Sequence, residues 1–226
     1  MDSTTSTQTP RTTVRRLGER GRYDRETINA IIDEALICHV GFSVDGQPYV
    51  VPTTHARLGD VLYVHGSNSS RMLKNMKAGI PVCITITLID GLVLARSAFH
   101  HSMNYRSAVI LGLAREITDE QEKRTAFHAL VNHVVPGRTA DVRAADAQEL
   151  RATTVLCIPI TEASAKVRSG PPVDAEEDYA LKCWAGVLPM QLQAGLPIDD
   201  PRLEFGTPVP PAVATYRRQG LRSDID

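Results

Sequence analysis

The stretch that decides the fold spans residues 61–74 and reads Val61-Leu62-Tyr63-Val64-His65-Gly66-Ser67-Asn68-Ser69-Ser70-Arg71-Met72-Leu73-Lys74. Its first five residues are mostly apolar and predict a short strand, and the glycine and small polar residues that follow predict a turn. A basic helix is then expected to begin at Ser70. Backbone N–H groups, serine hydroxyls and two cations therefore meet within one turn, which is what a phosphate monoester requires.

This stretch differs from the known nucleotide-binding loops. It has neither the G-x-x-x-x-G-K-[ST] spacing of a nucleoside triphosphate loop nor the G-x-G-x-x-G spacing of a dinucleotide fold. Any phosphate that it binds therefore belongs to another compound. The alternative interpretation is an ordinary loop followed by a capped, solvated helix.

Composition limits the class of protein. A chain of 226 residues with 42% hydrophobic residues supports one domain with a normal core. The net charge of −1 and the 5% aromatic content argue against a nucleic-acid-binding module. No segment is long and apolar enough to span a bilayer, and the N-terminus lacks a signal pattern. We therefore expect a cytoplasmic protein with neither nucleic acid nor membrane as a partner.

Cysteine and histidine spacing predicts no metal centre. None of the four cysteines forms a C-x-x-C pair, and Cys38, Cys83 and Cys157 lie within apolar, strand-like runs. The adjacent histidines at 100 and 101 would point in opposite directions on an extended chain, so one ion is not expected to bind both.

The chain divides into three parts. Residues 1–20 are rich in Ser, Thr and Arg and predict a flexible arm. Residues 21–190 carry the periodic segments and predict one cofactor-binding domain. Residues 191–226 are rich in proline and polar residues and predict an irregular extension.

Short strands joined by tight turns predict a mainly β protein with peripheral helices. A helix capped by Asp24 precedes two strands that flank Asp45-Gly46, a dipeptide that favours a hairpin turn. Asp90-Gly91 predicts a second hairpin of the same kind. Further strands are expected at 61–65, 82–89, 92–98, 107–117, 153–160 and 163–168, and helices at 70–78, 120–134 and near 144–150. The expected fold is an antiparallel split β-barrel of six or more strands with helices at its side.

Several motifs, taken in order, resemble a known family. They are residues 41–52 (Gly-Phe-Ser-Val-Asp-Gly-Gln-Pro-Tyr-Val-Val-Pro), 62–66, 70–76, 81–84 and 105–112. Together they resemble the pyridoxamine 5′-phosphate oxidase-like flavin-binding superfamily, and within it the nitroimidazole-reductase-like branch. The resemblance extends from about Ile28 to Pro189, and it implies a split barrel that binds FMN at the interface of a homodimer.

The resemblance also assigns positions to the cofactor. The segment that holds the FMN phosphate corresponds to Ser67, Ser70, Arg71, Met72 and Lys74. The strand along the isoalloxazine edge corresponds to Pro52, Thr53, Thr54 and His55, and a strand start close to the cofactor corresponds to Tyr105, Arg106 and Ser107. The alternatives are that the threonines are ordinary strand residues and that Arg106 pairs with a surface carboxylate.

Four further residues are candidates for catalysis or ligand binding. His65 begins the phosphate loop and is the expected proton donor, although it could instead only support the loop by hydrogen bonding. Trp184, the single tryptophan, is expected to stack over the flavin or to cover the substrate pocket of its own or the partner subunit; simple burial is the alternative. Lys166 and Arg168 share one side of a strand and are expected to hold an anionic group of cofactor or substrate, unless they form a solvated edge.

The expected function is that of an FMN-dependent oxidoreductase. Reduced flavin would pass electrons to a small organic acceptor, with nitro compounds as one class and NAD(P)H as the reductant. The alternative is a non-catalytic flavin or haem carrier, because relatives in the barrel superfamily bind haem and one histidine suffices to hold it.

Overall fold

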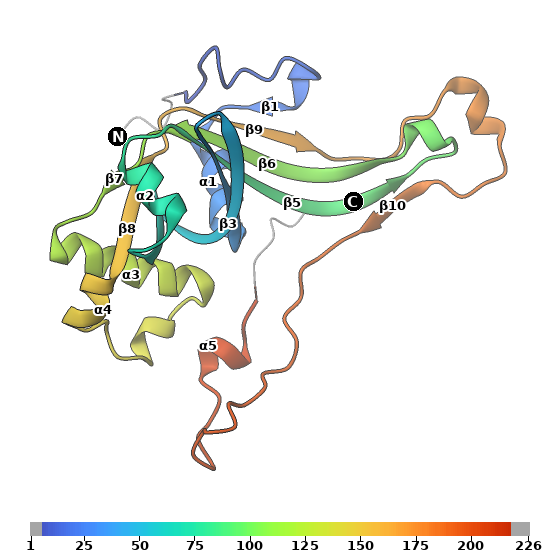
Figure 1. Ribbon diagram of the computed structural model, residues 1–226. Coiled ribbons are helices and arrows are strands. Elements are labelled where there is room, and N and C mark those ends of the chain that lie inside the picture. The colour runs from blue at the N-terminus through green and yellow to red at the C-terminus, as the bar shows by residue number, and fades with distance from the viewer. Residues whose placement is uncertain (1–5, 218–226) are drawn as a thin grey trace.

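An antiparallel sheet of ten strands forms the centre of the protein in the computed structural model, which describes residues 6–217 (Figure 1). The strands are ordered β1-β9-β6-β5-β2-β3-β4-β8-β7, and β10 pairs with β5 outside this path. Neighbouring strands are antiparallel throughout. The helices lie beside the sheet, so the expected mainly β split barrel is confirmed.

The elements have the following bounds. The strands are β1 (Gly21–Arg22), β2 (Ile37–Val44), β3 (Gln47–Leu58), β4 (Val61–Ser67), β5 (Val82–Leu94), β6 (Ser102–Gly112), β7 (Arg115–Glu116), β8 (Thr153–Pro159), β9 (Ala163–Arg168) and β10 (Gly186–Pro189). The α-helices are α1 (Arg25–Glu34), α2 (Arg71–Lys77), α3 (Glu120–Val134), α4 (Ala147–Ala152) and α5 (Pro211–Ala214), and short 3-10 helices include η2 (Ala98–His100) and η4 (Glu176–Ala180). Within residues 6–217, no helix combines the length and the apolar character that crossing a bilayer requires.

Local sequence signals account for the first helix and the first hairpin. The Asp24 side chain accepts a hydrogen bond from the Thr27 N–H at 2.8 Å and caps α1, whose apolar stripe is fully buried in the core. Between β2 and β3, both Asp45 and Gly46 have positive φ angles, of 50° and 80°. This pair of conformations matches a type I′ turn, and it explains why Asp-Gly was a correct hairpin signal here.

The hairpin predicted at Asp90-Gly91 is wrong. Strand β5 continues through this dipeptide, with a bulge between Ile89 and Gly91, and pairs with β6 on both sides of it. Gly91 is needed for a different reason. A Cβ atom at this position would lie 2.8 Å from Cγ1 of Val187, so the absent side chain allows β10 to pack against β5. Because β10 approaches from far along the chain, local sequence did not reveal this role.

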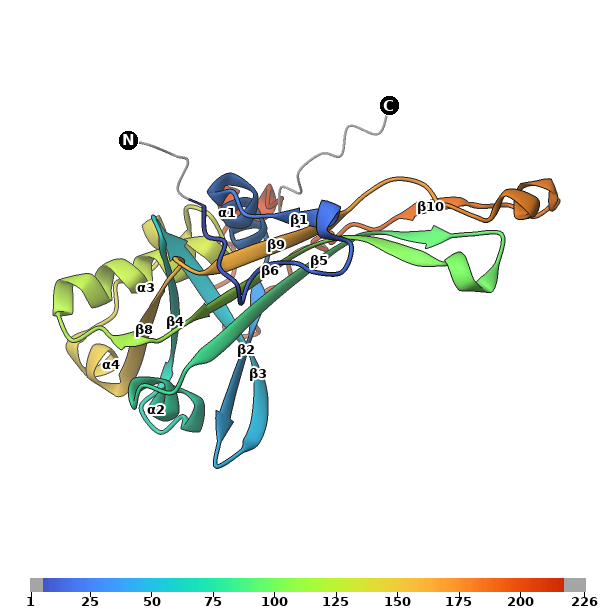
Figure 2. The same cartoon turned by 90° about the horizontal axis from the view of Figure 1, so that it is seen from above.

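The continued strand builds an arm, defined here as residues 89–105 and 169–190, that projects from the body of the protein (Figures 1 and 2). The ends of β5 and β6, together with β10, η2 and η4, form it. Its surface carries many large apolar side chains, among them Phe99, Met103, Val173, Tyr179, Leu181, Trp184 and Leu188, and Phe99 is 89% exposed. Exposed large apolar side chains gathered on one projecting segment are typical of an interaction site.

The two ends of the described chain differ from each other. Residues 6–20, expected to form a flexible arm, pack on β9: the Thr7 hydroxyl is buried and donates to the carbonyl of Ala163 at 2.9 Å, and Lys166 donates to the carbonyl of Arg16. Residues 191–217 are irregular apart from α5, as expected. The first five residues and residues 218–226 lie outside the described part of the chain.

Candidate functional site

The loop at residues 67–70 is the centre of the candidate site, and its backbone is held in place by Asn68. The Asn68 amide donates to the carbonyl of Arg151 at 2.7 Å and accepts from the Thr154 hydroxyl at 2.8 Å. The Ser67 and Ser69 hydroxyls lie 2.8 Å apart at the exposed surface of the loop. Anchoring to α4 and β8 therefore preorganises a row of hydroxyl groups at the end of β4.

Helix α2 begins directly after this loop, as the strand–turn–helix pattern predicted. Ser70 is its N-cap, and its hydroxyl oxygen accepts a hydrogen bond from the Leu73 N–H at 3.4 Å. The Met72 side chain is buried in the core, which removes it as a side-chain contact for a cofactor. The backbone N–H groups of the first helical turn still point toward the loop, where an anion would meet them.

Two cations complete this site. Arg71 and Lys74 are both exposed, and neither forms an ion pair with a carboxylate within residues 6–217. The Arg71 guanidinium carbon lies 4.3 Å from the ring centroid of Tyr49 on β3, and Tyr49 in turn stacks on Phe42. Tyr49 was missed as a site residue; it lies within a motif that carried the family resemblance, but only the folded chain places it beneath Arg71. Together these contacts hold a guanidinium without a counterion beside the serine loop.

Strands β3 and β4 separate next to this site. Their ladder ends at the pair His55 and Val64, so Pro52–Thr54 and His65–Ser67 lie on two diverging strands. Pro52 and Thr54 lie on the same face of the sheet as the exposed Ile37, whereas Thr53 shares the core face with the buried Cys38. His55 is fully buried, and its Nε2 donates to the carbonyl of Ile32 at 2.9 Å. Pro52 is exposed and both threonines are partly exposed, so these three residues retain an accessible position and His55 does not.

His65 lies on the side of β4 that faces α3. Its ring packs edge-on against Phe127, with 6.0 Å between the ring centroids. Its Nδ1 atom is buried and has no hydrogen-bond partner among the described residues. Burial lowers the pKa of the imidazole, so at neutral pH the ring is uncharged. An uncharged imidazole with a free nitrogen is suited to accept a proton or bind a metal, and less suited to the expected role of proton donor.

The depressed pKa of His65 predicts a pH-dependent stability. The unfolded chain binds a proton at this residue at a higher pH than the folded chain, so acidification below about pH 6.5 favours unfolding. We expect His65→Gln to lose less stability than the wild type between pH 7 and pH 5. Urea unfolding at both pH values provides the measurement, and identical losses for the two proteins would contradict the prediction.

Strand β6 carries the three residues expected near the cofactor, but on two different faces. Tyr105 and Ser107 lie on the outer face of the sheet, and Arg106 points the opposite way, toward α1. The Arg106 guanidinium binds Glu34 at 2.8 Å and Asp90 at 2.7 Å, and these hydrogen-bonded carboxylates raise its pKa. Arg106 is therefore engaged in a largely buried ionic cluster on the α1 side of the sheet, not in an open position for a ligand.

The two cations of β9 differ in exposure. Register pairs Ser107 with Lys166 and Tyr105 with Arg168, so all four residues share the outer face of the sheet. Lys166 is partly exposed, whereas Arg168 is 9% exposed and donates to Asn104 and to the carbonyls of Gly170 and Pro171. Burial lowers the pKa of the Arg168 guanidinium. Arg168 thus holds the base of the arm, and Lys166 is the more accessible cation.

Trp184 lies on the arm, directly before β10. It is 69% exposed, and its ring lies so close to Gly186 that a Cβ atom there would be 2.8 Å from Cζ2. Figure 1 shows the arm extending away from α2, so within one chain the tryptophan does not reach the serine loop. Contact with a flavin at that loop would require a second copy of the chain.

One group of side chains has the composition of a metal site. Within residues 6–217, ligand atoms of His100, Asp174 and Asp178 lie within 4.8 Å of one another on the arm. Asp174 is already bound by Arg96, through its backbone N–H at 2.9 Å and its guanidinium at 3.1 Å. This neutralises the buried carboxylate, and the expectation of no metal site stays a prediction.

Fold and site together define an antiparallel split-barrel protein in which two exposed cations lie beside a serine loop at a strand–helix junction. The family model described as pyridoxamine 5′-phosphate oxidase matches residues 24–167. The chain belongs to this family, which confirms the resemblance seen in its motifs. No curated protein matches the chain.

Solved structures with similar folds support the same assignment. The flavocytochrome Anf3 from Azotobacter vinelandii is 42% identical with a TM-score of 0.86, and the match covers 92% of this chain and 97% of that one. The FAD and haem binding protein from Mycobacterium smegmatis is 38% identical with a TM-score of 0.83, covering 86% and 95%. A Bacteroides thetaiotaomicron protein assigned to 5-nitroimidazole antibiotic resistance is 30% identical with a TM-score of 0.54, covering 65% and 86%.

Proposed function

We propose that this protein is a flavin-binding redox protein whose flavin phosphate binds at the Ser67–Lys74 cradle. The observation that carries the proposal is the pair of exposed cations, Arg71 and Lys74, beside an anchored serine loop and a helix N-terminus. Elsewhere in the described chain, arginines commonly pair with carboxylates, as Arg106 and Arg57 do. Cations kept without a counterion next to hydroxyl and N–H donors favour a bound phosphate.

The cradle serves either FMN or FAD, because both carry a phosphate on the ribityl chain. The Mycobacterium smegmatis relative is described as binding FAD. We therefore propose FAD in place of the expected FMN. Mass spectrometry of the acid-released cofactor distinguishes the two, and release of FMN alone would overturn the choice.

Haem is the second group that we propose. Two relatives support it by description, one as a flavocytochrome and one as a FAD and haem binding protein. The residue that fits is His65, because its Nδ1 is buried without a partner and its lowered pKa keeps the ring in the uncharged form that binds iron. When bound, flavin supplies one- or two-electron transfer and haem one-electron transfer.

Each residue of the site would have its own role in binding the cofactors. Arg71 and Lys74 neutralise the phosphate, and Tyr49 restricts the orientation of the Arg71 fork. His65 would hold iron or accept a proton, and Phe127 limits access of water to one face of its ring. Reduction of a nitro compound with NAD(P)H as donor is the second candidate activity, and the nitroimidazole-resistance relative favours it.

We also propose that two copies of the chain form the functional unit. The exposed apolar surface of the arm is the support, and Trp184 on the arm could contact a flavin only in another copy. Light scattering after size-exclusion chromatography should give twice the 24.7 kDa chain mass. A monomer at micromolar concentration would contradict this proposal.

The visible spectrum of the full chain tests the cofactor proposals. Absorption near 375 and 450 nm, about where flavins absorb, is expected together with a Soret band. His65→Ala should remove the Soret band and leave the flavin bands, because the cradle does not depend on this side chain. Anaerobic titration with NADH or NADPH, followed by nitroaromatic reoxidation, then separates an enzyme from a carrier. A protein that is colourless and takes up neither added flavin nor haemin would refute the proposed function.

A further inference from the structure

A cavity of about 760 Å³ lies between the outer face of α3 and residues 139–149, away from the serine loop. Phe127 and Val131 of α3 form one wall, and Val142, Ala144 and Ala145 form the other. Its volume is within the range of small-molecule sites, and most of its lining is apolar. Phe127 also contacts the His65 ring, but none of the residues of the Ser67–Lys74 cradle lines the cavity.

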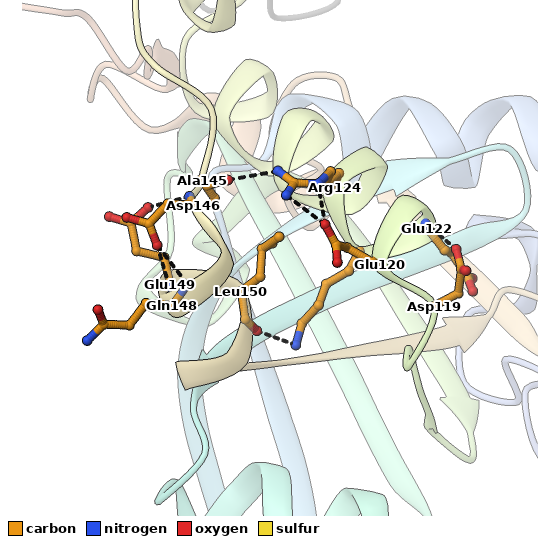
Figure 3. A network of polar contacts seen from close by, with 10 residues as sticks. Asp119, Glu120, Glu122, Arg124, Ala145, Asp146, Gln148, Glu149 and Leu150 are labelled. Carbon is orange, nitrogen blue, oxygen red and sulfur yellow. Dashed lines mark hydrogen bonds and ion pairs between the residues drawn. The ribbon is translucent and has the colours of Figure 1, made fainter.

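Polar contacts between α3 and α4 hold the two walls together (Figure 3). The Arg124 guanidinium donates to the carbonyl of Ala145 at 2.8 Å, and Lys123 donates to the carbonyl of Leu150 at 2.6 Å. A capping box formed by Asp146 and Glu149 fixes the start of α4. The cavity is therefore built into the fold.

The charged groups at the cavity are already paired. Arg124 binds Glu120 at 2.7 Å, and Arg143 binds Glu149 at 2.6 Å. An anionic or cationic ligand would have to compete with these internal partners, so the lining favours a neutral molecule. In this respect the cavity is the opposite of the Ser67–Lys74 cradle, whose cations have no carboxylate partner in the part of the chain that the structure describes.

Two features of the lining select the ligand further. The Phe127 ring offers an aromatic surface against which a planar ligand can stack. The His128 Nε2 and the Thr139 hydroxyl, which also line the cavity, lie 2.8 Å apart, and both side chains are also bonded to Asn132, so their hydrogen-bonding groups are satisfied within the fold. We propose that this cavity binds a neutral, planar aromatic compound that stacks on Phe127 and requires no polar partner.

The test is a titration of the full chain with menadione, a naphthoquinone, monitored by calorimetry in protein stripped of flavin. Val131→Trp fills the cavity from α3, and we expect at least a tenfold weaker binding. Val134→Trp is the matched control, because this valine is on the same helix but does not line the cavity, and its affinity should stay within twofold. Ala144→Phe fills the cavity from the other wall and should repeat the loss if Val131→Trp does not fold.

Other outcomes would overturn the proposal. One is wild-type protein that does not bind menadione, and another is equal binding by the filled and control variants. Loss of menadione binding in Arg71→Ala would place the quinone at the flavin cradle instead. If menadione displaced haemin and Val131→Trp also lost the Soret band, the cavity would be a haem pocket and the proposal would fail. Because the titration needs no flavin, it can fail or succeed independently of the proposed function.

Discussion

Replacing Arg71 with alanine is expected to weaken flavin binding by about 2–4 kcal/mol, the cost of truncating one partner of a desolvated charge pair. This corresponds to a roughly 30- to 1000-fold higher dissociation constant. The reason is that Arg71 is the one planar fork in the cradle, held over Tyr49 at 4.3 Å and without a carboxylate partner in the described chain. Flavin fluorescence quenching on titration into apoprotein measures the constant.

Two further variants, one on the same helix and one on β3, make this result specific. Lys77→Ala removes a cation that is paired with Glu116 at 2.7 Å, and it should change flavin affinity less than twofold. Tyr49→Ala leaves the charge but removes the ring beneath it, so an intermediate loss is expected. If Arg71→Ala and Lys77→Ala bind flavin equally well, the phosphate lies elsewhere and the cradle assignment fails.

Replacing Arg106 with leucine is expected to lower the free energy of unfolding by about 3 kcal/mol, as breaking a buried ion pair does. The guanidinium side chain is 11% exposed and the Glu34 side chain 13% exposed, so the substitution removes the guanidinium partner of a poorly solvated carboxylate. Asp90, which is 31% exposed, loses its partner in the same step. The change should appear as a lower urea midpoint with an unchanged slope.

Two comparisons separate this effect from the loss of any charge. Arg143→Leu removes an arginine that is 68% exposed and should change the free energy of unfolding far less than Arg106→Leu does, because solvent screens surface ion pairs. Adding Glu34→Leu to Arg106→Leu should recover part of the stability, because the carboxylate left in the cluster is then removed as well. Flavin affinity of folded Arg106→Leu should remain near the wild-type value. If Arg106→Leu instead lost much of its flavin affinity while its stability stayed unchanged, Arg106 would be a cofactor-binding residue.

Local signals were sufficient for much of the fold. Asp24, Ser70 and Asp119 each cap the helix that the sequence predicted after them, because N-caps act on the next two or three backbone N–H groups. The Asp45-Gly46 turn was likewise predictable, since both residues adopt positive φ angles that this dipeptide tolerates. The turn and helix start of the expected cradle belong to this group, because its members lie within eight consecutive residues; anion binding there stays a prediction.

Long-range contacts decided the remaining features. The same dipeptide at residues 90–91 is a bulge in a continuous strand, because β10 approaches Gly91 from nearly a hundred residues away along the chain. Because successive side chains of a strand alternate between its two faces, Arg106 points toward α1, and Tyr105 and Ser107 lie on the outer face of the sheet. The sequence showed a cation at each of positions 71, 106 and 168, but it did not show which of them has a partner.

The sequence by itself therefore determined the family and the antiparallel strands and predicted an anion cradle, since each of these depends on residues that are neighbours in the chain. Only the tertiary structure decided which side chains remain available for a ligand. Among residues 6–217, Arg71 has no carboxylate partner, Arg106 and Arg168 are used within the fold, and the buried Nδ1 of His65 has no hydrogen-bond partner. The physical reason is that availability depends on the partners that packing supplies, and those partners come from distant segments of the chain.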